Sequence, residues 1–247
     1  MDPTTLPVVG MLLHGGADLL TALAEGLSPF VGDAASALAV VALTLAVRLV
    51  LVPLAVVQVR AERDRRRLAP RLAELRRRHG RDAQRLQRAV QELYTSERVS
   101  PLAGCLPVLA QAPVLSLVYT LFSHGTIGGV TNTLLEATLV GIPLGRSLVV
   151  VLTSPLWTHA WVVVLLLVLL ALVVEASRRA NLRWNPVAPV ADGAADPSSG
   201  AATAVTRWVP FVSVVFAGIA PLAATLYVVT SAVWTYGERA ALRRVIR

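Results

Sequence analysis

The sequence contains no lysine and only one cysteine among its 247 residues. Its 23 basic residues are therefore all arginine, a bias that carries no mechanistic information. A single cysteine, Cys105, excludes an internal disulfide framework. The four histidines lie far apart without ligand-like spacing, and neither a Walker motif nor a nucleophile constellation is recognisable. We therefore expect no catalytic residue, no metal site and no cofactor.

Apolar residues are abundant instead. They make up 55% of the chain, and its mean hydropathy is +0.64. An ordinary soluble domain is much less apolar, so several membrane spans are expected. The composition thus predicts an all-α polytopic membrane protein.

Apolar runs alternate with charged or Gly- and Pro-rich segments, and this alternation divides the chain. We predict five spans, at 35–59, 103–123, 157–177, 208–220 and 222–239. The predicted cytoplasmic parts are a basic helical hairpin at 60–100, a flexible loop at 178–206 and a short tail at 240–247. The remaining parts are an extracytoplasmic segment at 1–34 and an extracytoplasmic, interfacial or re-entrant segment at 124–156.

Charge orients these spans. Residues 60–100 carry 13 arginines against 6 acidic residues, which favours the cytoplasmic side. The N-terminus then lies outside and the C-terminus inside. Residues 1–33 hold no arginine and lack the basic region of a signal peptide. Leucines between 12 and 27 recur at helical spacing, which favours an amphipathic helix on the membrane surface; a flexible tail is the alternative.

Arg48 interrupts the first apolar run. It lies twelve residues before Arg60, so along one straight helix it would be roughly 18 Å from the cytoplasmic edge. A lipid-facing arginine there costs about 3 kcal/mol on insertion scales, so a polar cavity, a carboxylate or water should face it. No acidic residue lies at matching depth: Glu175 should pair locally with Arg178 and Arg179, and Glu238 lies near a span end. We therefore favour a hydrated groove with an unpaired Arg48 over a buried ion pair.

Polar side chains on other spans could wall this groove. The last span carries a polar and aromatic stripe at i, i+3, i+4 and i+7, although packing between helices is the alternative explanation. The predicted groove residues are Arg48, Thr44, Gln58, Gln111, Ser116, Tyr119, Tyr227, Thr230, Ser231 and Trp234.

The basic hairpin has an apolar seam of its own. Leu68, Leu72 and Leu75 are spaced at i, i+4 and i+7, and a similar triplet begins at Leu86. Pro70 should bend the first helix or mark where a new one starts. The arginines outside the seam could contact anionic lipid, ribosomal RNA or an acidic protein, or could serve only to orient the chain.

Four stretches form a recognisable pattern: "VRLVLVPLAVVQ" at 47–58, "LAPRLAEL" at 68–75, "ELYTSERVSPLAGCLPVLAQAPVLSLVY" at 92–119 and "IAPLAATLYVVTSAVWTYGERAALRR" at 219–244. Together they resemble the YidC/Oxa membrane protein insertases. The matching positions are Arg48, Pro53, Pro101, Gly104, Cys105, Pro107, Gln111, Pro113, Tyr119, Pro221 and Tyr227. Ser100 departs from the usual Asn, and the residue after Pro221 is not the usual glycine.

The resemblance implies five transmembrane helices around a hydrophilic groove, with a cytoplasmic helical hairpin. It implies an insertase or chaperone in the bacterial cytoplasmic membrane, not an enzyme. The groove would hold polar segments of nascent membrane-protein clients while apolar segments enter the lipid bilayer. The ribosome, a targeting receptor or the Sec translocon are further candidate partners, and no direct DNA binding is expected. A non-transporting assembly scaffold and a small anion transporter are the alternatives.

Overall fold

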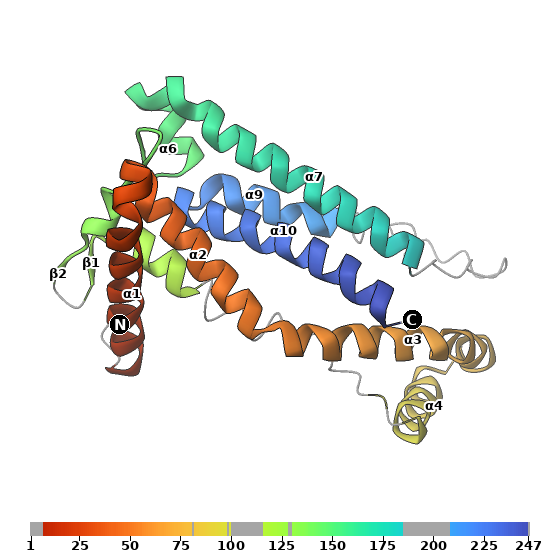
Figure 1. Ribbon diagram of the computed structural model, residues 1–247. Coiled ribbons are helices and arrows are strands. Elements are labelled where there is room, and N and C mark those ends of the chain that lie inside the picture. The colour runs from red at the N-terminus through yellow and green to blue at the C-terminus, as the bar shows by residue number, and fades with distance from the viewer. Residues whose placement is uncertain are drawn as a thin grey trace.

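The structure is a computed structural model that describes residues 7–80, 82–97, 99, 116–127, 130–184 and 208–246. Helices dominate this part of the chain (Figure 1). The longer ones are α1 (Pro7–Val31), α2 (Ala35–Val50), α3 (Val52–His79), α4 (Ala83–Ser96), α7 (Ala160–Trp184), α9 (Val212–Ile219) and α10 (Leu222–Val245). Residues 116–123 are also helical.

The body of the molecule is formed by α2, α7, α9 and α10, which run side by side (Figure 1). Small residues let the backbones of α2 and α10 approach closely, since Ala39, Ala223 and Ala224 are fully buried. The faces of α7 and α9 that point away from this core expose large apolar side chains such as Leu172 and Val215. An apolar outer surface of this kind matches lipid better than water.

Two described segments are long and apolar enough to cross a membrane, His14–Val50 and Pro155–Trp184. A shorter apolar helical segment runs over Val209–Ile219. It begins with the 3₁₀ turn η6 (Val209–Phe211) and continues as α9. The arrangement of five spans remains a prediction, because only two described segments meet the length and hydropathy expected of a span.

The N-terminal segment folds into α1 and packs along α2. Leu20 is buried there, and Leu23 and Leu27 lie against the same core. A flexible tail is therefore the wrong alternative for residues 7–31. Gly32 has a φ of +54° in the 3₁₀ turn η2 (Gly32–Ala34), a conformation that glycine adopts without strain, and there the chain turns from α1 into α2.

The helix over 35–59 is not straight, although the depth estimate for Arg48 assumes that it is. It breaks at Leu51, between α2 and α3, and the axis changes direction there (Figure 1). The cause is Pro53, which has no N–H to donate and occupies the first turn of α3. Helix α3 then continues past Arg60 and through Pro70, so the hairpin grows out of the first span without a loop and no new helix starts at Pro70. The depth of Arg48 therefore does not follow from counting residues back from Arg60.

Helices α3 and α4 pack against each other and project from the body (Figure 1). Leu68 is buried in their seam. The carboxylate of Asp82 caps α4 by accepting a hydrogen bond from the backbone N–H of Arg85 at 3.0 Å. Glu97, directly after α4, pairs with Arg67 at 2.8 Å and also with Arg71, which ties the end of α4 to α3.

The segment over 124–156 is not purely helical, which corrects the all-α expectation locally. It contains two antiparallel hairpins, β1 (Thr126–Ile127) with β2 (Val130–Thr131) and β3 (Thr138–Leu139) with β4 (Ile142–Pro143). The 3₁₀ turn η4 (Thr133–Leu135) lies between the hairpins, and the short helix α6 (Leu148–Leu152) and the 3₁₀ turn η5 (Pro155–His159) lead into α7.

This segment is bonded to the start of α10. The N–H of Ala223 donates to the carbonyl of Leu144 at 3.0 Å, and the N–H of Leu222 donates to that of Arg146 at 2.9 Å. The side chains of Ile142 and Leu144 are fully buried. The hairpins therefore cover one end of the helical body with a packed, apolar layer.

Candidate substrate groove

Arg48 lies in the last turn of α2, and its side chain is 8% exposed. No hydrogen bond or ion pair joins it to another side chain in the part of the chain that the structure describes. A buried guanidinium without such a partner is expensive unless polar groups or water reach it. The surroundings of Arg48 are therefore the place to look for function.

A cavity of about 780 Å³ opens beside Arg48, between α7 and the α9–α10 hairpin. Its walls are mostly apolar, with several polar groups among them. The lining residues are Arg48, Leu170, Val173, Val174, Ser177, Arg178, Asn181, Leu182, Pro210, Val212, Ser213, Phe216, Tyr227, Val228, Ser231, Ala232 and Thr235. We call this cavity the groove.

Helix α10 supplies the polar wall of the groove through Tyr227, Ser231 and Thr235, which recur every four residues. The hydroxyl of Thr235 donates to the carbonyl of Ser231 at 2.8 Å. The Ser231 hydroxyl is buried and has no hydrogen-bond partner among the described residues. A buried, unpaired hydroxyl beside a cavity is available to a polar guest or to water.

Glu238 lies nearer to Arg48 than the sequence suggests. Both Tyr227 and Glu238 are close enough to interact electrostatically with the guanidinium, although no ion pair within 4.0 Å forms. The expectation that no acid approaches Arg48 is therefore wrong in part. The bend at Leu51 is the reason, because it places Arg48 near the end of α2 instead of the middle of a long helix.

Of the predicted groove residues, the structure brings together Arg48, Tyr227 and Ser231. The other predicted groove residues that the structure describes, Thr44, Gln58, Ser116, Tyr119, Thr230 and Trp234, do not line the groove. Thr44 is buried, and its hydroxyl donates to the carbonyl of Val40 at 2.7 Å within its own helix. Gln58, Thr230 and Trp234 are half-buried outside the groove, and Ser116 is exposed. The ring centre of Tyr119 lies 6.2 Å from that of Phe216, which lines the groove.

Six predicted motif residues fall outside the described residues: Pro101, Gly104, Cys105, Pro107, Gln111 and Pro113. Of the remaining motif residues, Pro53 breaks the first helix and Pro221 precedes α10. Their structural roles follow from these two positions, since proline is favoured where a helix starts.

Sequence reasoning missed the contribution of α7. Leu170, Val173, Val174, Ser177 and Asn181 follow one helical face at spacings of three and four, and this pattern could have identified the wall. The local pairing of Glu175 is confirmed, with Arg178 at 2.7 Å and Arg179 at 2.6 Å.

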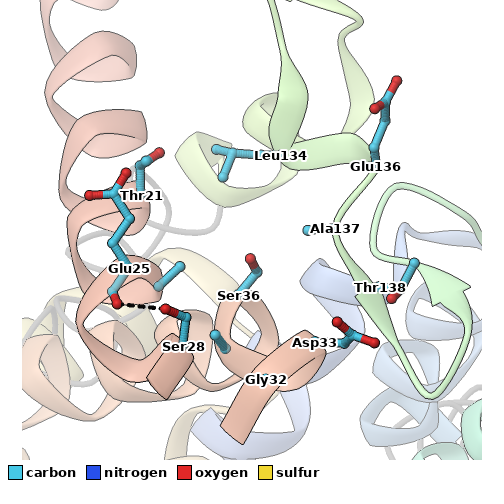
Figure 2. A pocket seen from close by; sticks show the side chains of 12 residues that line it. Thr21, Glu25, Ser28, Gly32, Asp33, Ser36, Leu134, Glu136, Ala137 and Thr138 are labelled. Carbon is cyan, nitrogen blue, oxygen red and sulfur yellow. Dashed lines mark hydrogen bonds between the residues drawn. The ribbon is translucent and has the colours of Figure 1, made fainter. Parts of the chain in front are cut away.

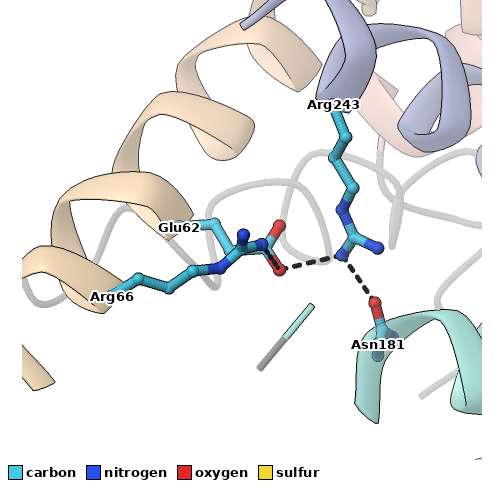
Figure 3. Close-up of polar contacts among 4 residues, drawn as sticks. All are labelled: Glu62, Arg66, Asn181 and Arg243. Atoms are coloured by element: carbon cyan, nitrogen blue, oxygen red, sulfur yellow. Dashed lines mark hydrogen bonds and ion pairs between the residues drawn. The ribbon is translucent and has the colours of Figure 1, made fainter. Parts of the chain in front are cut away.

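A polar cluster joins the C-terminal ends of α7 and α10 to α3 (Figure 3). Arg243 of α10 is 4% exposed, and its Nη2 donates to Glu62 of α3 at 2.8 Å and to Asn181 of α7 at 2.6 Å. Arg66 also pairs with Glu62, with its Nη2 3.2 Å from the carboxylate, and its guanidinium carbon lies 4.1 Å from the centre of the Trp184 ring. The sequence carries no signal for this cluster, because its members come from three distant helices.

A second cavity, of about 460 Å³, lies at the opposite end, among α1, η2 and the hairpin segment (Figure 2). Its acidic lining residues are Glu25, Asp33 and Glu136. The Ser28 hydroxyl donates to the Glu25 carbonyl at 2.9 Å. Among the described residues, no group of three His, Cys, Asp or Glu side chains could hold a metal ion.

Comparison with known proteins agrees with the residue patterns. A "Membrane protein insertase YidC" of Maricaulis maris (strain MCS10) is 42% identical over 106 residues, which is 42% of this chain and 17% of that relative. The protein of the same name from Stenotrophomonas maltophilia (strain K279a) is 42% identical over 81 residues, 33% of this chain and 14% of the relative. The matched region thus spans less than a fifth of these relatives.

A sequence model of the family described as "60Kd inner membrane protein" matches residues 27–247, which is most of the chain. The match includes the helix that carries Arg48, the basic hairpin and both helices that wall the groove. The chain therefore belongs to the 60Kd inner membrane protein family, which is the YidC/Oxa family that its motifs resemble.

Proposed function

We propose that the protein is a membrane protein insertase. The groove beside Arg48 would hold the polar segment of a nascent membrane protein while the client's apolar segment passes into lipid. The observation that carries the proposal is the buried Arg48, which faces a cavity of about 780 Å³ and makes no ion pair with a described residue.

A polar client segment must cross the low-dielectric interior of the bilayer. Moving a charged side chain to the middle of a bilayer costs roughly 3 kcal/mol on insertion scales. A groove with a cation, hydroxyls and room for water shortens the distance over which a client must do without polar partners. The arginine would favour client tails that carry Asp or Glu, because it attracts their charge at short range.

The mostly apolar walls of the groove suit the release of the client's apolar segment into lipid. Phe216, Val212 and Leu170 offer an apolar client segment the same environment as lipid, so nothing holds it back from leaving. We infer five spans, with the N-terminus outside and the C-terminus inside, in the bacterial cytoplasmic membrane. The arginines on α3 and α4 would then face the cytoplasm, where nascent chains arrive and where a ribosome or targeting receptor could dock.

The packed layer at the start of α10 argues against an anion transporter. Ile142, Leu144, Leu121 and Phe122 are buried between the helices and the hairpin segment, so the described residues offer no polar lining for a path from Arg48 to that end. An assembly scaffold that uses only the hairpin would not need a cavity at Arg48.

The test is insertion of a small client with an acidic outer tail into vesicles containing the purified full chain. Wild type, Arg48→Lys and Arg48→Ala are compared. Arg60→Ala serves as the matched control, since Arg60 is exposed twelve residues further along and does not line the groove. We expect Arg48→Ala to lower the insertion rate by about tenfold or more, while Arg48→Lys and Arg60→Ala stay near wild type.

Normal insertion by Arg48→Ala would refute the groove mechanism. If deletion of the hairpin then abolished client assembly, the scaffold alternative would replace it. Thermal unfolding of each variant separates loss of function from loss of folding.

A further inference from the structure

A smaller cavity of about 240 Å³ adjoins the groove at its inner end, between the last turns of α7 and α10. We call it the basic pocket. Its polar lining residues include Asn181, Trp184, Tyr236, Arg239, Arg243 and Arg244. No acidic residue lines it, so a guest would meet positive charge on several sides.

The three arginines of the basic pocket differ in whether an acidic side chain pairs with their positive charge. Arg243 is bound to Glu62 and held in place by Asn181 (Figure 3). Arg239 and Arg244 form no ion pair with an acidic side chain in the described part of the chain. Two positive charges therefore remain for an anion at a concave site, where field lines converge.

Arg243 gives the pocket a rigid wall. Its guanidinium lies 5.3 Å from the centre of the Trp184 ring, and its Nε is buried without a hydrogen-bond partner among the described residues. An arginine fixed by a carboxylate, an amide and an aromatic ring has little rotamer freedom left to lose when a ligand binds. The pocket is thus organised before a ligand arrives.

The basic pocket and the groove adjoin each other, because Ser177, Asn181 and Thr235 line both. Beyond these shared residues the groove walls are mostly apolar, with Leu182, Val174 and Pro210 among them, and the polar wall of α10 occupies one side. One molecule with an anionic end and a long apolar chain would match the two cavities together. Trp184 and Tyr236 are of the residue types that gather at the level of lipid headgroups.

We propose that the basic pocket binds the phosphate headgroup of an anionic phospholipid, with one acyl chain of that lipid in the groove. Basic pockets between helices on the cytoplasmic side of a membrane are suited to such headgroups. The inference depends on the membrane location of the protein and not on the insertion reaction, since lipid binding is measured without a client.

The experiment measures lipids retained by the purified full chain in native mass spectrometry. Equal amounts of phosphatidylglycerol and phosphatidylcholine with the same acyl chains compete for the protein. The test variant is Arg239→Gln/Arg244→Gln. The matched control is Arg179→Gln/Arg183→Gln, which removes two exposed arginines at the end of α7 that do not line the pocket.

We expect wild type to retain one phosphatidylglycerol in preference to phosphatidylcholine by about tenfold or more, since each nearby arginine contributes to the attraction. The test variant should lose this preference, and the control should keep it. Arg239→Lys/Arg244→Lys should also retain most of the preference, which shows that charge and not folding is responsible.

Equal retention of the two lipids by wild type would overturn the proposal, as would equal loss in the test variant and the control. Two competitors distinguish other occupants. Displacement of the lipid by millimolar inorganic phosphate would show a free-anion site instead of a lipid site. Displacement by an acidic peptide at lower concentration than phosphatidylglycerol would assign the pocket to a client segment.

Discussion

Arg243 of α10 donates a hydrogen bond of 2.8 Å to Glu62 of α3, although 181 positions separate the two residues in the chain. Helix α3 continues from this contact into the basic hairpin, and α10 continues from it into the polar wall of the groove. The pair therefore joins the base of the hairpin to the helix that carries Tyr227 and Ser231.

Replacing Arg243 with Met should destabilise the protein by about 3 kcal/mol. The pair is largely buried, so the substitution leaves Glu62 and Asn181 without one of their partners. The loss should fall at the lower end of the range for buried pairs, because Arg66 still binds Glu62. Thermal unfolding in a zwitterionic detergent, with no anionic lipid present, measures it.

The control is Arg183→Met, which changes an exposed arginine on α7 and should alter stability by less than about 0.5 kcal/mol. Replacing Glu62 as well as Arg243 should cost less than the sum of the two single changes. Strict additivity would mean that the two side chains do not interact in the membrane.

Ser231→Leu should slow client insertion several-fold without unfolding the protein. The leucine side chain would fill part of the groove next to Arg48 and remove a buried hydroxyl that has no partner among the described residues. Thr230→Leu is the matched control, because Thr230 is next to Ser231 in the chain but does not line the groove. Vesicle insertion rates and unfolding temperatures are compared, and equal rates for both variants would exclude Ser231 from the client path.

Local features of the fold could be predicted from local patterns. The leucine seam of the hairpin, the pairing of Glu175 with Arg178 and Arg179, and the apolar helix α7 all depend on residues a few positions apart. The sequence also predicts that Arg48 meets something polar, and a cavity does open beside it; that this cavity is a hydrated groove stays a prediction. Spacing along α10 correctly grouped Tyr227 with Ser231.

Other features depend on geometry that no short pattern contains. The bend at Leu51 follows from Pro53, yet whether a proline bends or breaks a helix is decided by what packs around it. Glu238 interacts electrostatically with Arg48 although the sequence places it near a span end, and Gln58 does not line the groove. Thr44 illustrates a further ambiguity, because a buried hydroxyl can equally well bond to its own helix.

Asn132→Asp should loosen the segment over 124–156. The Asn132 amide donates to the carbonyls of Leu121 and His124, the latter at 3.0 Å, and its oxygen accepts from the N–H of Leu134 at 3.2 Å. Aspartate keeps the size but cannot donate when ionised, so two carbonyls lose their partner, at a cost of about 1–3 kcal/mol each when buried. Hydrogen exchange of residues 130–146 should rise.

Glu136→Gln is the matched control for this segment, since Glu136 is exposed and no hydrogen bond or ion pair to another described residue holds it. Its exchange should equal that of wild type. Unchanged exchange in Asn132→Asp would mean that the apolar packing of Ile142 and Leu144, and not the amide, holds the segment in place.

Glu238→Gln should increase the selectivity of insertion for acidic client tails. Glu238 attracts the positive charge of Arg48 and therefore competes with a client carboxylate for the same cation. Glutamine keeps the size of the side chain but removes the charge, so the rate ratio between clients with Asp tails and matched Asn tails should rise by about threefold or more.

Glu74→Gln, an exposed change on the hairpin, should leave the ratio unchanged. An unchanged ratio for Glu238→Gln would mean that Glu238 does not compete with the client. If Arg48→Ala in the same assay still inserts normally, the cation itself is not the feature that the client meets.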